Sequence, residues 1–205
     1  MKYYEPYTEF RTHPSKVSLK NSKGKEIYIE IGPGISFGAG HHTTRLCIRG
    51  FEEIFKFRRI GTVLDLGCGS GVLGISAAAL GAERVLAVDI DPVAVEEAIE
   101  NVNSNGMGSI VQVLHGSSED AQGRFDLVVA NIVTNELILL REKIKAKVEE
   151  DGVLLVSGIY EYKKELAVSK FGEIGFSLAG EFSDGGWIAL WFNKKPSSKV
   201  LSDVR

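Results

Sequence analysis

A glycine-rich stretch that opens with an aspartate carries the strongest chemical signal in the sequence. Residues 65–71 read Asp-Leu-Gly-Cys-Gly-Ser-Gly, a D-x-G-x-G-x-G pattern. Glycine allows positive φ and lets a ligand approach the backbone closely. A dinucleotide site prefers G-x-G-x-x-G, with the pyrophosphate against a helix N-terminus. Because the carboxylate of Asp65 would repel a pyrophosphate, this spelling favours a ligand that carries an ammonium group or hydroxyls instead.

A second acidic residue follows at the distance at which nucleotide folds bind a ribose. Asp89 lies 22 residues after Gly67, at the end of the next apolar run. A carboxylate there can accept hydrogen bonds from both ribose hydroxyls. The alternative is that Asp89 is an ordinary strand-end residue, while Asp91, followed by Pro92, is a typical helix N-cap. Position 89 suits both NAD and S-adenosylmethionine. The loop spelling favours S-adenosylmethionine, which has an amino-acid head, a ribose and no phosphate.

A further glycine cluster lies closer to the N-terminus. At the chain's own glycine frequency of 23 in 205, about two glycines would fall in the 17 positions of the two clusters, and eight do. Each cluster alone is compatible with a tight turn, so the flanking residues decide between a turn and a ligand-binding loop. The eight are Gly32, Gly34, Gly38, Gly40, Gly67, Gly69, Gly71 and Gly74.

The elements around these loops predict a scaffold that brings strand ends together. Short apolar runs alternate with helical patterns, which is typical of the α/β class. We expect a Rossmann-like, doubly wound sheet of seven strands, mostly parallel, with an antiparallel C-terminal hairpin. In such sheets ligands bind at the switch point, which here follows the strand 62–66. The expected strands are 62–66, 84–88, 110–114, 125–130, 152–157, 176–182 and 187–193, and the expected helices are 72–80, 92–105, 137–148 and 162–175.

Composition excludes several other classes. The two cysteines, Cys47 and Cys68, form no C-x-x-C pair, so neither a disulfide framework nor a zinc ribbon is expected, and no metal site is predicted. The N-terminus lacks the apolar core of a signal peptide, and no apolar run is long enough to span a bilayer. A net charge of −3 gives no strong nucleic-acid signal. We expect a cytoplasmic protein with an N-terminal extension over 1–30 that serves as a lid or a partner arm, a domain over 31–193 and a flexible tail over 194–205.

Three stretches carry a resemblance to class I S-adenosylmethionine-dependent methyltransferases, and more narrowly to the ribosomal protein L11 methyltransferases (PrmA type). Residues 32–44, GPGISFGAGHHTT, are similar to the family signature D-P-G-x-A-F-G-T-G-T-H-P-T-T, but one residue shorter. Residues 65–73 resemble D-x-G-C-G-S-G-I-L, and residues 130–133 resemble A-N-I-L. The resemblance covers roughly residues 30–193. The family carries a separate N-terminal domain that recognises the target protein, and we expect this chain to lack it.

The resemblance also implies a site. Asn131 is the expected catalytic residue, because its amide oxygen can accept a hydrogen bond from the attacking amine. Phe37 would pack over the cofactor from a glycine-rich lid. The shortened signature leaves His41 and His42 open between loop-surface, substrate-shaping and base roles, and the adenine contact open between a serine and Glu119. The expected cofactor-binding residues are Phe37, Thr44, Asp65, Gly67, Gly69, Gly71, Asp89, Ile90, Ser117 and Asn131.

The leading hypothesis is transfer of a methyl group from S-adenosylmethionine to a lysine or α-amine of a protein, with S-adenosylhomocysteine as product; the resemblance implies a ribosomal protein as the substrate. The first rival is a small-molecule or nucleic-acid methyltransferase of the same fold. Asn131-Ile132 is not followed by two prolines, which argues against the N-P-P-Y motif of base and glutamine methylases. An inactive cofactor-binding module and an NAD-dependent dehydrogenase are the other rivals. These motifs leave the methyl acceptor, the number of methyl groups transferred and the oligomeric state open.

Overall fold

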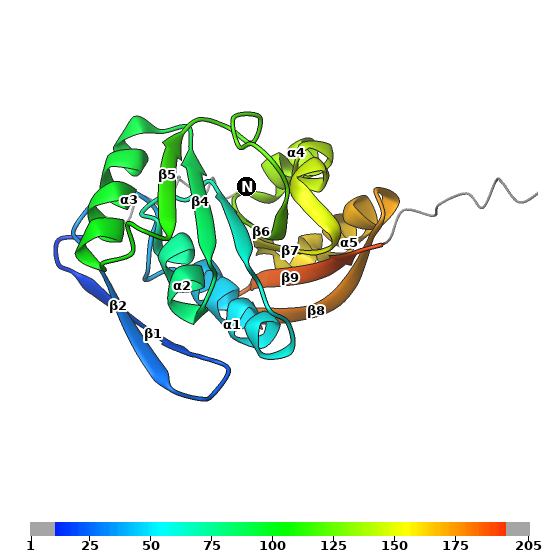
Figure 1. The fold of residues 1–205 in the computed structure, drawn as a ribbon. Helices are drawn as coiled ribbons and strands as arrows, with labels where there is room; N and C mark the ends of the chain where they lie inside the picture. The colour runs from blue at the N-terminus through cyan, green and yellow to red at the C-terminus, as the bar shows by residue number, and fades with distance from the viewer. Residues whose placement is uncertain (1–10, 196–205) are drawn as a thin grey trace, which may run out of the picture.

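A seven-stranded sheet forms the centre of the structure, a computed structural model that describes residues 11–195 (Figure 1). Its strand order is β5-β4-β3-β6-β7-β9-β8. The first five strands of this order are parallel, and β9 runs antiparallel to both β7 and β8. The predicted seven-stranded, mostly parallel α/β sheet with an antiparallel hairpin is therefore confirmed. The strands are β3 (Thr62–Leu66), β4 (Arg84–Asp89), β5 (Val111–His115), β6 (Phe125–Asn131), β7 (Val148–Tyr160), β8 (Phe176–Asp184) and β9 (Trp187–Lys194).

Helices cover both faces of this sheet because its strands are buried on both sides. In β3, Val63 points into one apolar cluster and Leu64 into the other, as the two-residue period of a strand requires. The first cluster lies under α1 (His42–Phe57), α2 (Val72–Leu80) and α3 (Pro92–Ser104). The second lies under α4 (Thr134–Lys147) and α5 (Lys164–Glu173), which follows the short 3₁₀ turn η1 (Glu161–Lys163). No helix in the described part of the chain is both long and apolar enough to cross a membrane.

The predicted helix ends agree with the structure where a cap residue marks them. Asp91 caps α3 by accepting a hydrogen bond from the backbone N–H of Val93 at 2.9 Å, and Pro92 occupies the first turn. Gly81 ends α2 with a φ of 112°, a left-handed conformation in which glycine is favoured. The start of α3 and the end of α2 therefore lie where the sequence predicted.

Other boundaries differ from the prediction. The helix expected over 137–148 begins at Thr134 and ends at Lys147, and β7 begins at Val148 rather than at Gly152. The helix expected over 162–175 is α5, shortened by the turn η1. On α3, the apolar side chain of Ile99 is 42% exposed while Asn101 is buried. Asn101 faces inward because it binds backbone groups of two loops, which outweighs the apolar gain from burying Ile99.

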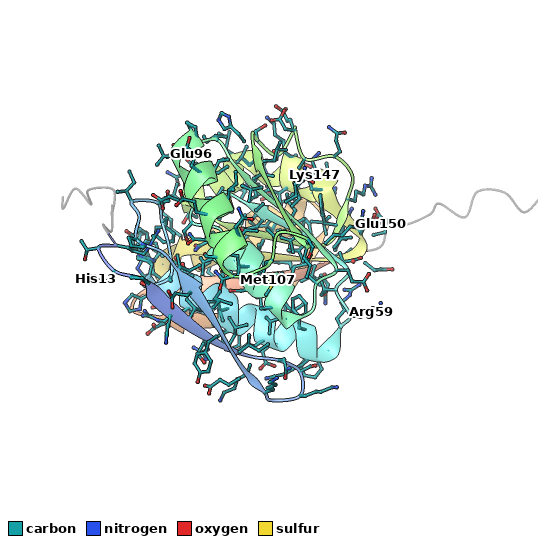
Figure 2. All side chains as sticks on the ribbon, turned by 60° about the vertical axis from the view of Figure 1, so that its left-hand side comes forward. His13, Arg59, Glu96, Met107, Lys147 and Glu150 are labelled. Carbon is teal, nitrogen blue, oxygen red and sulfur yellow. The ribbon has the colours of Figure 1, made fainter. Side chains whose placement is uncertain are left out.

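An antiparallel hairpin of β1 (Ser15–Lys20) and β2 (Glu26–Ile31) packs beside the helices α1, α2 and α3 rather than joining the central sheet (Figures 1 and 2). It buries one apolar face, and Asn105 holds its edge by binding both the N–H and the C=O of Glu30, at 3.0 and 2.7 Å. This hairpin was not among the predicted strands. Residues 1–10 of the expected extension and 196–205 of the expected tail lie outside the described residues. The buried face consists of Val17, Leu19, Ile29 and Ile31.

Candidate functional site

A cavity of about 480 Å³ lies at the C-terminal ends of β3, β4 and β6. Here β4 and β5 continue the sheet on one side of β3, and β6 and β7 on the other, so this is the switch point at which such sheets bind ligands. Its volume is within the usual range of roughly 300–1,000 Å³ for small-molecule sites. The lining residues are Ile35, Ser36, Phe37, Leu66, Gly67, Gly69, Val88, Asp89, Ile90, Asp91, Ala94, Gly116, Ser117, Ser118, Glu119, Asn131, Ile132, Glu136, Leu140 and Lys143.

The loop after β3 brings its backbone to the cavity wall. Gly67 and Gly69 have φ values of 71° and 53°, which L-residues rarely adopt. A Cβ at Gly67 would lie 2.7 Å from a methyl carbon of Ile132, and one at Gly69 would lie 2.7 Å from the carbonyl oxygen of Phe37. Glycine is thus required here both by the turn and by the closeness of neighbouring groups.

Asp89 ends β4 at the floor of the cavity and is only partly buried. One carboxylate oxygen accepts a hydrogen bond from the N–H of Gly69 at 2.8 Å, and the other accepts one from the N–H of Asp91 at 3.0 Å. These two bonds fix the orientation of the carboxylate. A carboxylate offers about four acceptor positions, so Asp89 retains the capacity to bind two ligand hydroxyls.

Asp65 lies behind the glycine loop and does not line the cavity. Its Oδ2 accepts a hydrogen bond from the N–H of Gly74 at 2.8 Å, which ties the end of β3 to helix α2. Its Oδ1 is buried and has no hydrogen-bond partner among the described residues. Burial raises the pKa of Asp65 to about 7, more than the Gly74 bond lowers it. Asp65 thus acts on the shape of the loop.

Asn131 ends β6 on the opposite side of the cavity from Asp89. Its amide nitrogen donates a long hydrogen bond of 3.5 Å to the hydroxyl of Thr44, whose own hydrogen is donated to the carbonyl of Gly38 at 3.1 Å. These two hydrogen bonds orient the amide so that its nitrogen faces Thr44 and its Oδ1 remains as the acceptor available to a ligand. That oxygen is buried without a hydrogen-bond partner in the described residues, an arrangement that is unfavourable unless a ligand supplies a donor.

The charge of the cavity wall is strongly negative. Four carboxylates and one ammonium group line it, and the ammonium of Lys143 is paired with Glu119 at 3.0 Å. A wall of this composition attracts a cationic ligand and repels a phosphorylated one. The carboxylates are Asp89, Asp91, Glu119 and Glu136.

The two histidines at the start of α1 both have structural contacts. His41 caps the helix, because its ring nitrogen accepts the N–H of Thr43 at 3.2 Å. His42 contacts the carboxylate of Asp184 at 2.7 Å, and Arg45 shares that carboxylate at 3.4 Å. These contacts link the start of α1 to the turn between β8 and β9.

The structure brings most of the predicted site residues to one cavity. Phe37, Gly67, Gly69, Asp89, Ile90, Ser117 and Asn131 line it. Thr44, Asp65 and Gly71 lie behind the wall: Gly71 has a φ of 78° and lies so close to α3 that a Cβ there would be 3.1 Å from that of Ala98. The adenine candidates, Ser118 and Glu119 as well as Ser117, also line the cavity.

Sequence reasoning missed the residues that hold the first glycine cluster. Asn101 binds the N–H of Gly32 at 2.8 Å and the carbonyl of Ser70 at 2.9 Å, so it joins the two glycine loops. Arg11 and Glu97 contact the same segment. A partial signal was available, because Glu97 and Asn101 are spaced by four residues and so lie on one face of α3.

Comparison with known proteins agrees with the motifs. A family model described as ribosomal protein L11 methyltransferase (PrmA) matches residues 1–195. The ribosomal protein L11 methyltransferase of Pelotomaculum thermopropionicum is 42% identical over 193 residues, which cover 92% of this chain and 62% of that protein. The one from Clostridium botulinum is 41% identical over 167 residues, covering 80% and 52%. This chain therefore spans less than two thirds of the length of these relatives.

A solved structure is similar over most of both chains. The crystal structure of ribosomal protein L11 methylase from Lactobacillus delbrueckii subsp. bulgaricus has a TM-score of 0.74 and 36% identity, and the match covers 80% of this chain and 84% of that one. Matching motifs, a matching family model and this structural similarity lead to one conclusion: the chain belongs to the ribosomal protein L11 methyltransferase (PrmA) family.

Proposed function

We propose that this protein is an S-adenosylmethionine-dependent methyltransferase that transfers methyl groups to a lysine or α-amine nitrogen of a protein, with a ribosomal protein as the favoured substrate. The observation that carries the proposal is the combination of a negatively charged cavity with the unpaired Oδ1 of Asn131 at its edge. The methylated partner and a cytoplasmic location are inferred from the family. Residues 31–193 would form the methyltransferase domain.

The residues of the cavity fit this cofactor. S-adenosylmethionine carries a sulfonium and an ammonium group but no phosphate, and the wall has four carboxylates and one paired lysine. Gly67 lines the cavity, and its backbone would contact the amino-acid head. Asp89 would bind the ribose hydroxyls, and the segment from Gly116 to Glu119 would surround the adenine. When bound, the cofactor supplies an electrophilic methyl group.

Asn131 has the chemistry to align an attacking amine. Its Oδ1 can accept an N–H of the amine, which turns the nitrogen lone pair away from that bond and toward the cavity. Orientation of this kind can supply several kcal/mol of the barrier. A lysine amine has a pKa near 10.4 in water, and desolvation at the cavity edge lowers it, so no strong general base is needed.

Calorimetry with S-adenosylmethionine, S-adenosylhomocysteine and NAD tests the cofactor. We expect the first two to bind and NAD not to bind. Lysate of a strain that lacks this protein, incubated with the enzyme and labelled S-adenosylmethionine, then tests the acceptor, with Asn131→Ala as the control. A labelled ribosomal protein supports the proposal. A labelled metabolite or nucleic acid would identify a different acceptor, and tight NAD binding without binding of either S-adenosyl compound would refute the cofactor assignment.

A further inference from the structure

A buried ion pair lies directly behind the segment that forms one wall of the cavity. Nη2 of Arg11 and Oε2 of Glu97 are 3.0 Å apart, and the two side chains are only 4% and 14% exposed. Arg11 precedes β1 and Glu97 lies on α3, so the pair joins parts of the chain 86 residues apart. Burial of two charges is costly unless their remaining polar atoms are also bound, so those other contacts indicate what the pair does.

The remaining polar atoms of the pair bind the backbone next to Phe37. Oε1 of Glu97 accepts the N–H of Ile35 at 2.8 Å and that of Ser36 at 3.2 Å. Nη1 of Arg11 donates to the carbonyl of Ser36. Both backbone polar groups of Ser36 are therefore held by the pair. Phe37, the next residue, lines the cavity.

The glycines of this segment provide the space for the two charged side chains. A Cβ at Gly34 would lie 2.5 Å from Cδ of Glu97 and 2.8 Å from Nη2 of Arg11, and one at Gly38 would lie 3.0 Å from Cζ of Arg11. Neither glycine is among the described residues with positive φ. Close packing against the ion pair thus accounts for these two glycines, without any need for a mobile lid.

A second set of bonds holds Phe37 from the other side. Its carbonyl accepts the N–H of Ser70 at 3.1 Å, and the carbonyl of Ser70 accepts from Asn101. The backbone of Arg11 also pairs with Gly34 in both directions, at 2.8 and 3.0 Å. The wall that carries Phe37 is therefore fixed to α3 and to the glycine loop.

We propose that Arg11 and Glu97 are positioning residues that hold the 32–40 segment in its cofactor-binding conformation. This rests on the proposed function, because it takes the cavity to be the S-adenosylmethionine site. The apparent dissociation constant equals the intrinsic one divided by the fraction of molecules in the binding conformation. Loss of the pair lowers that fraction and weakens binding. Because Asn131 is untouched, the rate at saturating cofactor is preserved.

The test uses Arg11→Met, Glu97→Gln and the double variant in the full chain. Glu96→Gln is the matched control, since Glu96 is the exposed neighbour on α3 labelled in Figure 2. Calorimetry with S-adenosylhomocysteine and the KM for S-adenosylmethionine are measured. We expect each single variant to raise Kd and KM about tenfold, corresponding to a tenfold fall in the competent fraction. The Kd and KM of the double variant should stay within threefold of the values for the single variants, because the pair acts as one unit. In all three variants kcat should change less than threefold.

Hydrogen exchange separates failure of this proposal from failure of the proposed function. Exchange at the amides of Ile35, Ser36 and Phe37 should accelerate in the variants and not in Glu96→Gln, whether or not the wild type binds the cofactor. The proposal would be overturned if the folded variants bound the cofactor like the control. It would also be overturned if the losses of affinity multiplied in the double variant, or if amide hydrogen exchange at residues 35–37 were unchanged. If Arg11→Met does not fold, Arg11→Lys replaces it, with an expected intermediate rise in Kd. Lack of binding by the wild type would refute the proposed function alone.

Discussion

The buried carboxyl of Asp65 makes the stability of this protein depend on pH in an unusual direction. Burial raises its pKa from 3.8 to about 7. A folded-state pKa above the unfolded one means that the folded protein binds the proton more tightly. The resulting stabilisation is fully present below about pH 4 and is lost as the pH rises toward 7 and above.

The size of this effect follows from the shift. With pKa values of 3.8 unfolded and about 7 folded, protonation of Asp65 stabilises the fold by about 3 kcal/mol at pH 5 and contributes almost nothing at pH 8. Asp65→Asn has nearly the same shape but no titration. The difference in unfolding free energy between Asp65→Asn and wild type should therefore move by about 3 kcal/mol in favour of the variant between pH 5 and pH 8.

Urea unfolding of both proteins at pH 5, 6, 7 and 8 measures this difference, because titrating groups that do not interact with Asp65 cancel between the two curves. The m-values must agree for the comparison to hold. The introduced N–H of the amide lowers stability by an amount that does not depend on pH, so only the change with pH is diagnostic. A difference that stays constant within 0.5 kcal/mol over this range would refute the reasoning, as would a carbon-13 titration that places the Asp65 carboxyl near 4.

Three further substitutions have distinct expected results. Asn131→Ala should lower turnover about a hundredfold while cofactor Kd changes less than threefold, since the amide meets the amine rather than the cofactor; equal losses in both would contradict this role. Asp89→Asn should raise cofactor Kd about tenfold in calorimetry, because it removes a charge and an acceptor for ribose hydroxyls; it should also lower Tm, because the amide nitrogen cannot accept one of the two backbone N–H groups that the carboxylate binds. Gly158→Ala should lower the unfolding free energy by more than about 3 kcal/mol in urea, since Gly158 has a φ of 79° and a Cβ would lie 2.7 Å from the carbonyl carbon of Ile132. A loss below 1 kcal/mol would show that the strand ends can move apart.

The sequence predicted the parts of the fold whose signals are local. The strand Thr62–Leu66 is a buried apolar run bounded by glycine, and Asp91 with Pro92 marks a helix start by its own chemistry. The hairpin formed by residues 15–31 also has a local signal, because apolar and polar residues alternate in 15–20 and in 26–31, on either side of Gly24. The contacts that hold the 32–40 segment at the cavity wall could not be predicted from local signals, because they join residues that are distant in sequence. Nothing near Arg11 indicates that its partner is Glu97, and only packing decides that Asn101 is buried instead of Ile99.

The polar stripe on α3 also restricts how the length of the chain can vary. Three polar residues recur at four-residue intervals: Glu97, Asn101 and Asn105. They bind, in turn, the 32–40 segment, both glycine loops and strand β2. Adding or removing one residue between them would rotate everything downstream by about 100° around the helix axis. All the later contacts would be lost together, so this stretch of helix tolerates no insertion or deletion. Relatives that keep the three contacts must keep the same count of residues from 97 to 105, whatever those residues are.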